Sequence, residues 1–266
     1  MRQSSAKVFD NREVFSGVNH LSLCAPEIAT EARPGQFVMV RCGEDTLLRR
    51  PLSIHQVNET GEEIALLYSV VGKGTHWLSQ LKSGDNIDLL GPLGNGFSIY
   101  PASRKLLLVA GGMGIAPLYF LAQDAEKKGL SVTLLMGAQT AAQLKVCRPL
   151  SVETICATED GTFGWKGLVT DCLPDFVKEA DQTFACGPML MYRDMSHQKR
   201  RLKLEGKPVQ ISLEVRMGCG LGVCYACTVK TKSGLKQVCK DGPIFDLDDI
   251  LWNELNLCPN PDKTQP

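Results

Sequence analysis

The sequence has no long hydrophobic run and no net charge, and both absences exclude classes of function. None of its apolar stretches approaches the roughly 18 residues needed for a transmembrane helix. Lysine plus arginine number 29, as do aspartate plus glutamate, so no basic surface for nucleic acid is expected. The first residues, MRQSSAKVFDNREVF, lack the apolar core of a signal peptide. We therefore expect a soluble, cytoplasmic protein with no nucleic-acid and no membrane partner.

Length and composition favour two domains with a small addition. The chain has 266 residues, of which 44% are hydrophobic, so it can bury a sizeable core. At the usual domain size of roughly 100–200 residues, this length suggests two domains. The sequence patterns divide the chain into residues 1–101, 102–212 and 213–266.

Residues 1–101 predict an antiparallel β-barrel. Short apolar or β-branched runs alternate there with turns rich in glycine, proline and asparagine. Many short strands at regular spacing are typical of such barrels. Only residues 75–81 (THWLSQL) have the pattern of a helix in this part. The expected strands cover residues 18–26, 35–42, 63–71 and 85–93.

Residues 102–212 predict a doubly wound α/β domain with a parallel sheet. The run KLLLVAGG, from Lys105 to Gly112, is continuously apolar and ends in glycines, as buried parallel strands often do. Apolar strands then alternate with helices, which is the pattern of a doubly wound sheet. Further strands are expected at 130–138, 151–160 and 181–186, and helices at 115–128, from 167 and at 189–205.

Four of the eleven cysteines follow the spacing of a metal cluster. Cys219, Cys224 and Cys227 form C-x4-C-x2-C, and Cys239 follows after a longer gap. This is the plant-ferredoxin pattern for a [2Fe–2S] cluster, so it indicates electron transfer. Zinc is the alternative metal, although zinc sites usually combine two separate short cysteine pairs. A third interpretation is four buried cysteines that bind no metal.

The other seven cysteines are scattered along the chain. Without an export signal, an odd total of cysteines argues against a disulfide framework. Single cysteines are most often small buried hydrophobic residues. The scattered set is Cys24, Cys42, Cys147, Cys156, Cys172, Cys186 and Cys258.

Two segments of the barrel region favour a flavin nucleotide. The run Arg49–Ile54 (RRPLSI), at the end of an expected strand, offers a guanidinium for pyrophosphate and a serine hydroxyl for hydrogen bonding. The run Tyr68–Thr75 (YSVVGKGT) places glycines before the expected helix, with Thr75 as its N-cap. Each segment alone could be a solvated turn. Their order and proximity together predict a flavin site.

Two strand ends in the α/β part favour nucleotide binding. The turn Gly111–Gly114 follows an apolar strand and opens a helix, which is the context of a nucleotide-phosphate turn. The run Cys186–Pro188 follows the last expected strand, at the sheet edge where ligands bind in such folds. Cys186 alone could equally be a core thiol.

In this order, the motifs RRPLS, YSVVGKGT, VAGGMGIAP and ACGPM resemble the ferredoxin-NADP reductase superfamily. The segment SLEVRMGCGLGVCYACTVK, followed by VCKDGPIFDLDDI, is similar to the electron-transfer subunits of class 1B dihydroorotate dehydrogenases. The resemblance implies an antiparallel flavin-binding barrel, a doubly wound parallel-sheet nucleotide domain and a small C-terminal [2Fe–2S] domain. It also implies FAD, a [2Fe–2S] cluster and NAD as cofactors.

The resemblance assigns roles to single residues, and no catalytic acid or base is among them. The flavin-binding positions would be Arg50, Pro51, Leu52, Ser53, Leu67, Tyr68, Ser69, Gly74 and Thr75. The nicotinamide nucleotide would contact Gly111, Gly112, Gly114, Cys186, Gly187 and Pro188, with Cys186 as a positioning group. The cluster ligands would be Cys219, Cys224, Cys227 and Cys239.

A partner subunit is implied in the same way. An FMN-containing subunit would oxidise dihydroorotate to orotate in pyrimidine synthesis, in a heterotetramer of two catalytic and two electron-transfer subunits. Electrons would pass from FMN through the cluster and FAD to NAD⁺. The alternative within the superfamily is a reductase subunit of a hydrogenase, a sulfide dehydrogenase or a transhydrogenase. A binding module with a purely structural metal site is the alternative from another class.

The choice between NAD and NADP is weakly indicated. The segment MGAQTAAQLK, after the second α/β strand, lacks an arginine for a 2′-phosphate, so NAD is favoured. No acidic residue of the usual ribose-binding kind is evident there, and Lys145 and Arg148 lie close enough in sequence to change the preference.

An apolar segment near the end of the chain has two possible roles. It could dock a partner subunit beside the cluster, or it could cover the core of the cluster domain. Its members are Ile244, Phe245, Leu247, Ile250, Leu251 and Trp252.

Overall fold

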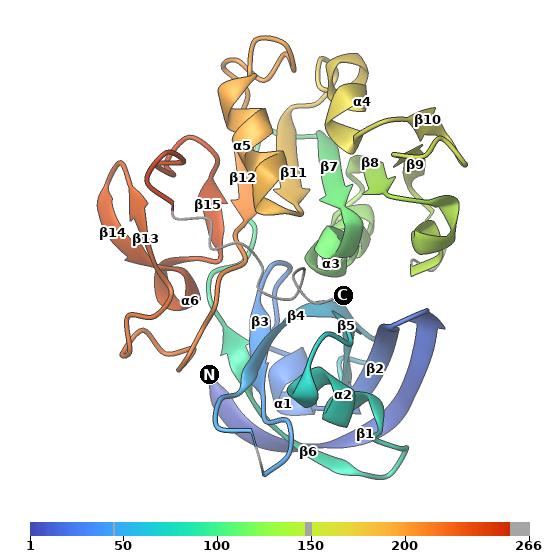
Figure 1. Cartoon of the computed structure of the whole chain (residues 1–266), viewed down its shortest axis with the longest axis vertical. Helices are drawn as coiled ribbons and strands as arrows, with labels where there is room; N and C mark the ends of the chain where they lie inside the picture. The colour runs from blue at the N-terminus through green and yellow to red at the C-terminus, as the bar shows by residue number, and fades with distance from the viewer. Residues whose placement is uncertain (45, 147–150, 256–266) are drawn as a thin grey trace, which may run out of the picture.

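The computed structural model describes residues 1–44, 46–146 and 151–255. Figure 1 shows a β-barrel at the bottom, an open sheet with helices at the top, and the segment around β13 and β14 beside both. Cys147, Arg148 and Cys258 lie outside the described residues, as does the side chain of Lys145. No helix in the described part of the chain is long and apolar enough to cross a membrane.

The N-terminal part is a closed barrel of six antiparallel strands in the order β1-β2-β5-β4-β3-β6. Its interior is filled by alternating apolar side chains such as Leu21, Leu23, Leu66 and Leu89, all fully buried. The strands are β1 (Arg2–Phe15), β2 (Val18–Cys24), β3 (Phe37–Val40), β4 (Arg50–Val57), β5 (Glu63–Ser69) and β6 (Asn86–Leu93). Two short helices, α1 (Pro26–Ala29) and α2 (Lys73–Ser79), connect them.

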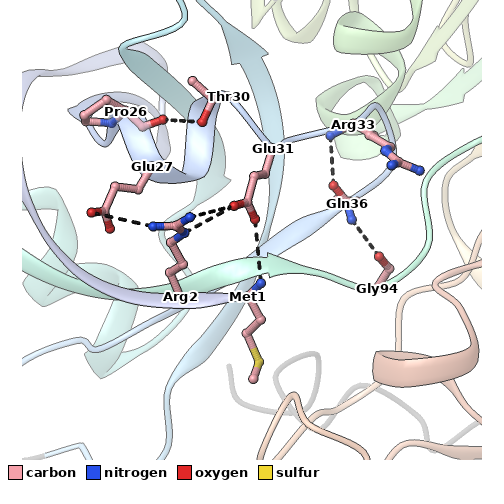
Figure 2. A network of polar contacts seen from close by, with 9 residues as sticks. All are labelled: Met1, Arg2, Pro26, Glu27, Thr30, Glu31, Arg33, Gln36 and Gly94. Atoms are coloured by element: carbon pink, nitrogen blue, oxygen red, sulfur yellow. Dashed lines mark hydrogen bonds and ion pairs between the residues drawn. The ribbon is translucent and has the colours of Figure 1, made fainter.

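Strand β1 closes the barrel by pairing with both β2 and β6. Arg2 at its start forms an ion pair with Glu31, which follows α1, with 3.1 Å between Nη2 and Oε1 (Figure 2). In the same view, Gln36 donates from Nε2 to the carbonyl of Gly94 at 2.8 Å and ties the α1–β3 loop to the end of β6. Exposed ion pairs add little stability, so the pairing of β1 with β2 and β6 accounts for most of the closure of the barrel.

The second part is a seven-stranded sheet in the order β10-β9-β8-β7-β11-β12-β15. Helix α3 packs on one face, and α4 and α5 pack on the other, which makes the fold doubly wound. The strands are β7 (Lys105–Gly111), β8 (Ser131–Ala138), β9 (Glu153–Thr158), β10 (Trp165–Lys166), β11 (Gln182–Cys186) and β12 (Val209–Ser212). The helices are η1 (Gly112–Gly114), α3 (Ile115–Lys127), η2 (Ala141–Val146), α4 (Val169–Phe176) and α5 (Met189–His197).

The cysteine-rich segment joins this sheet. After the hairpin β13 (Thr228–Thr231) and β14 (Gly234–Gln237) and the helix α6 (Val238–Asp241), β15 (Ile244–Asp246) pairs antiparallel with β12. All other neighbours in the sheet are parallel. The sheet is therefore parallel except for this antiparallel edge strand.

Three local expectations were wrong. The motif at Arg50 begins β4 and does not end a strand. Thr75 is not the N-cap of α2 but its third residue; the cap is Gly72, and the Thr75 hydroxyl accepts from the N–H of Val71 at 2.9 Å. Helix α5 ends at His197, well before Glu205.

The early end of α5 has a packing reason. Leu202 and Leu204 are both fully buried, and residues two apart point to different sides of a helix. Lys203 between them has φ 56°, so the chain is not helical where the two leucines turn inward. The chain therefore leaves the helix to bury both leucines.

The apolar segment near the end of the chain belongs to the core. Phe245, Leu247, Ile250 and Trp252 are each less than 10% exposed, and all lie in the hydrophobic cluster that also contains the sheet residues under α4 and α5. Of the scattered cysteines in the described part, Cys42, Cys172 and Cys186 are buried, Cys156 is half-buried, and Cys24 is exposed, contrary to expectation.

Candidate functional site

The cysteine-rich loop winds tightly between the end of β12 and β13. Gly220 and Gly222 have φ near +74° and +77°, a conformation that glycine adopts without strain. Tyr225, which is 69% exposed, has φ 58° although it is not glycine. Non-glycine residues held in this conformation cluster at active sites and ligand-binding loops.

Backbone N–H groups point at the cysteine sulfurs. The N–H of Leu221 lies 3.3 Å from Cys219 Sγ, that of Gly222 lies 3.2 Å from Cys239 Sγ, and that of Cys239 lies 3.4 Å from Cys227 Sγ. Hydrogen bonds to sulfur stabilise thiolates and tune the potential of iron–sulfur clusters.

The four sulfurs fall into two pairs. Burial raises the pKa of Cys219, but hydrogen bonds from the N–H groups of Leu221, Val223 and Cys224 and from the Cys224 thiol outweigh it and lower the pKa to about 6. Burial and the adjacent Cys227 thiol raise the pKa of Cys239 to about 12. In the described residues no group of three or more His, Cys, Asp or Glu side chains is arranged around a single metal ion. A [2Fe–2S] cluster, with four cysteines shared between two irons, suits two pairs.

A cavity of about 700 Å³ lies between the barrel, α3 and the approach to the cysteine loop. It brings together most residues that the sequence assigned to flavin. Arg50, Pro51, Leu52, Ser53, Leu67, Tyr68, Ser69 and Thr75 all line it. Gly74 is not among its lining residues but packs against Arg50, where a Cβ would lie 3.0 Å from Arg50 Nε.

The two adjacent arginines have different tasks. Arg49 forms an ion pair with Asp88, with 2.6 Å between Arg49 Nη2 and Asp88 Oδ2, and it also donates a hydrogen bond to the Asp88 carbonyl. Arg50 bonds only to the carbonyl of Leu48 through Nη1 among the described residues. Its guanidinium can therefore pair with an anion in the cavity.

A second cavity, of about 910 Å³, lies at the carboxyl ends of β7, β8 and β9. Gly111, Gly112 and Pro188 line it, as the sequence suggested, together with Phe15–Val18 of the barrel. Gly114, Cys186 and Gly187 do not line it. They form the backbone crossing beneath it, where a Cβ on Gly114 would lie 1.8 Å from the carbonyl oxygen of Cys186.

The two cavities are contiguous. Ser69, Val71 and Met113 line both. On its other side, the smaller cavity is bounded by residues 214–217, which lead directly into the cysteine loop. The cysteine loop, the smaller cavity and the larger cavity therefore lie in a row.

Sequence reasoning missed several charged residues of these cavities. Glu214 and Arg216 line the smaller one, and Glu159 and Asp194 line the larger one. The signal for Glu214 was an acidic residue two positions after β12, in the run ISLEV. Glu159 was missed because the acid was sought after the second α/β strand, whereas Glu159 follows the third, β9.

Comparison with known proteins supports the same interpretation. Residues 214–251 match the family model of the iron–sulfur cluster binding domain of dihydroorotate dehydrogenase B. The electron transfer subunit of dihydroorotate dehydrogenase B (NAD(+)) from Desulforamulus reducens is 40% identical, over 93% of this chain and 99% of that protein. The subunit of the same name from Clostridium acetobutylicum is 40% identical, over 93% of this chain and 97% of that protein.

The chain belongs to the family of dihydroorotate dehydrogenase B (NAD(+)) electron transfer subunits. It is therefore an oxidoreductase subunit that works with other subunits. The predicted family, function class and iron–sulfur segment are confirmed.

Solved structures confirm the fold class. An NADH-dependent reduced ferredoxin-NADP oxidoreductase, studied for flavin-based electron bifurcation, superposes with a TM-score of 0.83 at 32% identity, over 95% of this chain and 91% of that one. A ferredoxin NADP⁺ reductase from Neisseria gonorrhoeae with bound FAD and NADP superposes with a TM-score of 0.62 at 16% identity, over 78% of this chain and 93% of that one. The second likeness shows the shared fold alone.

Proposed function

We propose that this chain relays electrons from the FMN of a dihydroorotate-oxidising catalytic subunit, through a [2Fe–2S] cluster and FAD, to NAD⁺. The reaction serves pyrimidine biosynthesis, and the assembly contains two catalytic and two electron-transfer subunits. The cytoplasmic location expected from the sequence stays a prediction.

One observation above all supports the order of the relay. The smaller cavity has the cysteine loop at one side and shares Ser69, Val71 and Met113 with the larger cavity at the other. A group in the smaller cavity is therefore the only described link between a cluster and a ligand of the larger one. Flavin fits this middle position, since it accepts single electrons and releases a hydride.

The chain's own residues bind and orient the groups. Arg50, whose one bond among the described residues goes to the carbonyl of Leu48, supplies a guanidinium for the FAD pyrophosphate. Ser53 and Tyr68 line the same cavity, where the Ser53 hydroxyl can hydrogen-bond the ring system, while the Tyr68 hydroxyl donates to Asn11 Oδ1 at 3.3 Å. The turn at Gly111 and Gly112 opens α3 beside the larger cavity, where N–H groups can face the NAD pyrophosphate.

The four cysteines are proposed to hold the cluster in two pairs, Cys219 with Cys224 and Cys227 with Cys239. Cys227 and Cys239 are at most 3% exposed, whereas Cys224 is exposed. The exposed pair faces outward, where a partner subunit can deliver electrons. The buried pair lies in the hydrophobic core shared with β3 of the barrel.

An anaerobic absorbance titration of the complex isolated from its native host tests this proposal. Dihydroorotate is expected to bleach both the flavin and the iron–sulfur bands, and NAD⁺ is expected to restore them. If dihydroorotate leaves both bands unchanged while NADH bleaches them, the dihydroorotate partner is refuted and the cofactors stand. The co-purifying subunit would then be sought among hydrogenases, sulfide dehydrogenases and transhydrogenases.

A further inference from the structure

The linker between the barrel and the sheet, residues 95–104, belongs to no helix or strand. Gly111, at the carboxyl end of β7, lines the same cavity as residues 15–18 of the barrel. Because β7 begins at the opposite end of the sheet, the linker must run the length of the sheet to reach it (Figure 1). A chain that lies along a sheet without joining it needs other partners for its N–H and C=O groups.

Two buried glutamines of the sheet supply such partners. Gln182 on β11 and Gln210 on β12 both donate from Nε2 to the carbonyl of Ser98, at 2.8 Å and 3.0 Å. Gln210 Oε1 also accepts from the N–H of Ser98 at 3.0 Å. Gln182 Oε1 accepts from the N–H of Tyr100 at 2.9 Å. The two side-chain amides thus take the place that a neighbouring strand would have.

The start of the linker is bonded to the other two parts of the molecule. The N–H of Phe97 donates to the carbonyl of Pro34 in the barrel at 2.8 Å. Asn95 bonds to the end of α6, where its N–H donates to the carbonyl of Gly242 at 2.6 Å and its Nδ2 donates to that of Asp241 at 2.9 Å. A few neighbouring positions of the linker therefore join the barrel, the cluster segment and the sheet.

Amide side chains fix the linker in a way that apolar side chains would not. Gln182 and Gln210 are only 1% and 7% exposed. Phe184 and Cys186, which alternate with Gln182 on the same face of β11, belong to the hydrophobic cluster under α3. Apolar contact has no direction, whereas a buried amide must meet both a donor and an acceptor. The two glutamines therefore hold the linker in one register along the sheet.

The register of the linker matters because the barrel and the sheet together build the junction of the two cavities. Ser69 and Val71 come from the barrel side and Met113 from the turn into α3, and all three line both cavities. Another attachment lies close by, where Nδ1 of His55 on β4 lies 2.9 Å from the carbonyl oxygen of Ala116 on α3. If the linker slips, the barrel can rotate about this attachment, and the width of the junction changes.

We propose that Gln182 and Gln210 are positioning residues for hydride transfer between the flavin and NAD. This inference rests on the proposed relay. Neither glutamine is among the described residues that line the cavities, so both act through the linker on the distance between the two bound groups. A displacement of about 1 Å in a reacting pair can cost roughly a hundredfold in rate. A small shift of the barrel is therefore enough to slow the transfer.

The test removes the bonds of one glutamine and follows hydride transfer alone. Gln210→Met keeps the length of the side chain but loses both bonds to Ser98. The complex with this variant is mixed with NADH without oxygen, and bleaching of the flavin band is followed at increasing NADH concentrations. The limiting rate reports the transfer, and the half-saturating concentration reports the affinity for NADH. Dihydroorotate takes no part, so the assay stays informative if the proposed partner is wrong.

A second readout needs no turnover. Amide hydrogen exchange of residues 95–104 is measured on the same complex without nucleotide, because an amide that loses its acceptor exchanges faster. FAD content and the unfolding temperature are measured separately.

Gln210→Met is expected to retain FAD and to lower the limiting rate by about tenfold or more. The affinity for NADH should stay within about twofold of wild type, since the residues that line the larger cavity are unchanged. Exchange in the linker should become faster. Asn58→Leu is the matched control, because Asn58 Oδ1 also accepts from two backbone N–H groups, those of Glu62 and Glu63, both at 3.0 Å, within the barrel. Its limiting rate should equal that of wild type.

Two results would overturn the proposal. One is a Gln210→Met complex that unfolds at a lower temperature but reduces its flavin at the wild-type limiting rate, because the glutamines would then serve the fold alone. The other is an Asn58→Leu complex that is slowed as much as Gln210→Met. If Gln210→Met yields no FAD-containing complex, Gln182→Asn, which keeps the amide on a shorter side chain, is judged by the same two results. A wild-type complex that NADH does not bleach would instead refute the proposed relay, and this inference with it.

Discussion

The backbone crossing at Gly114 allows a sharp prediction about stability. Gly114 closes η1 and caps α3 with φ −59°, which any residue adopts. A substitution there therefore costs nothing in backbone conformation. Its entire cost comes from contact, because an added Cβ would lie 1.8 Å from the carbonyl oxygen and 2.2 Å from the carbonyl carbon of Cys186.

The magnitude follows from these distances. An ordinary carbon contact is about 3.5 Å or more, so Gly114→Ala requires roughly 1.5–2 Å of separation between η1 and β11. Cys186 ends a fully buried strand between β7 and β12, so its carbonyl cannot turn aside. Overpacking costs about 1–3 kcal/mol in general, and we expect Gly114→Ala to reach the upper end, about 3 kcal/mol.

Two other glycines provide controls in which backbone conformation, and not close contact, makes a substitution costly. Gly112 and Gly129 have φ +54° and +70°, and an added Cβ on either meets nothing within 4 Å. Their alanine variants should cost only the conformational term of about 1–2 kcal/mol. At about 2–4 °C per kcal/mol for a chain of this size, thermal unfolding should place Gly114→Ala about 6–12 °C below wild type, and lower than both controls.

The decisive result is the order of the unfolding temperatures of the three alanine variants. If Gly114→Ala melts at the wild-type temperature, the crossing of η1 over β11 is looser than the structure shows. If Gly112→Ala and Gly129→Ala are the more damaged variants, backbone conformation and not contact governs this turn. Either result would refute the reasoning from the Cys186 carbonyl.

Two further predictions concern charge. Glu159 lines the larger cavity, where no described lining residue is a lysine or arginine. Glu159→Arg should therefore shift the ratio of the NAD⁺ and NADP⁺ affinities toward NADP⁺ by about tenfold or more. Titration of the flavin absorbance band with each nucleotide measures this ratio. Asp181 accepts from the N–H groups of Arg104 at 2.7 Å and Lys105 at 2.9 Å, and these bonds lower its pKa. The ionised Asp181 carboxylate stabilises the fold fully above its unfolded-state pKa, and this contribution is lost as pH falls through the lower folded-state pKa. Asp181→Asn should therefore lower the midpoint temperature of unfolding at pH 7 but not in strong acid.

The strands that sequence reasoning recovered are those with a clear apolar pattern. The run that became β7 is buried from Leu106 to Ala110, and its glycine-rich end marked the turn into α3. Strand β1 was not foreseen, although it closes the barrel. Only Ala6 and Val8 of its 14 residues are fully buried, and the others are exposed or half-buried. So few buried apolar positions leave no clear pattern.

The cavity residues divide in a similar way. Motifs contiguous in sequence, such as Arg50–Ser53, pointed to the flavin cavity because a single turn carries several functional groups. Glu214 and Glu159 gave no such signal, since each is one acid at a strand end. Their place in the cavities depends on which strands are neighbours in the sheet, and strand order is set by packing along the whole chain.

The position of the cluster relative to the flavin cavity depends on the same packing. Phe37 and Met39 of β3 share one hydrophobic core with Cys227 and Cys239, and that core continues under the sheet to β15. Gly220 packs so closely on Met39 that an added Cβ would lie 2.6 Å from Met39 Cγ. Electron transfer between fixed centres depends on their separation, and here the barrel, the sheet and the cysteine loop jointly hold that separation. The loop is therefore not an independent module attached to a reductase, because the segment that follows it ends in β15, which pairs with β12 of the sheet.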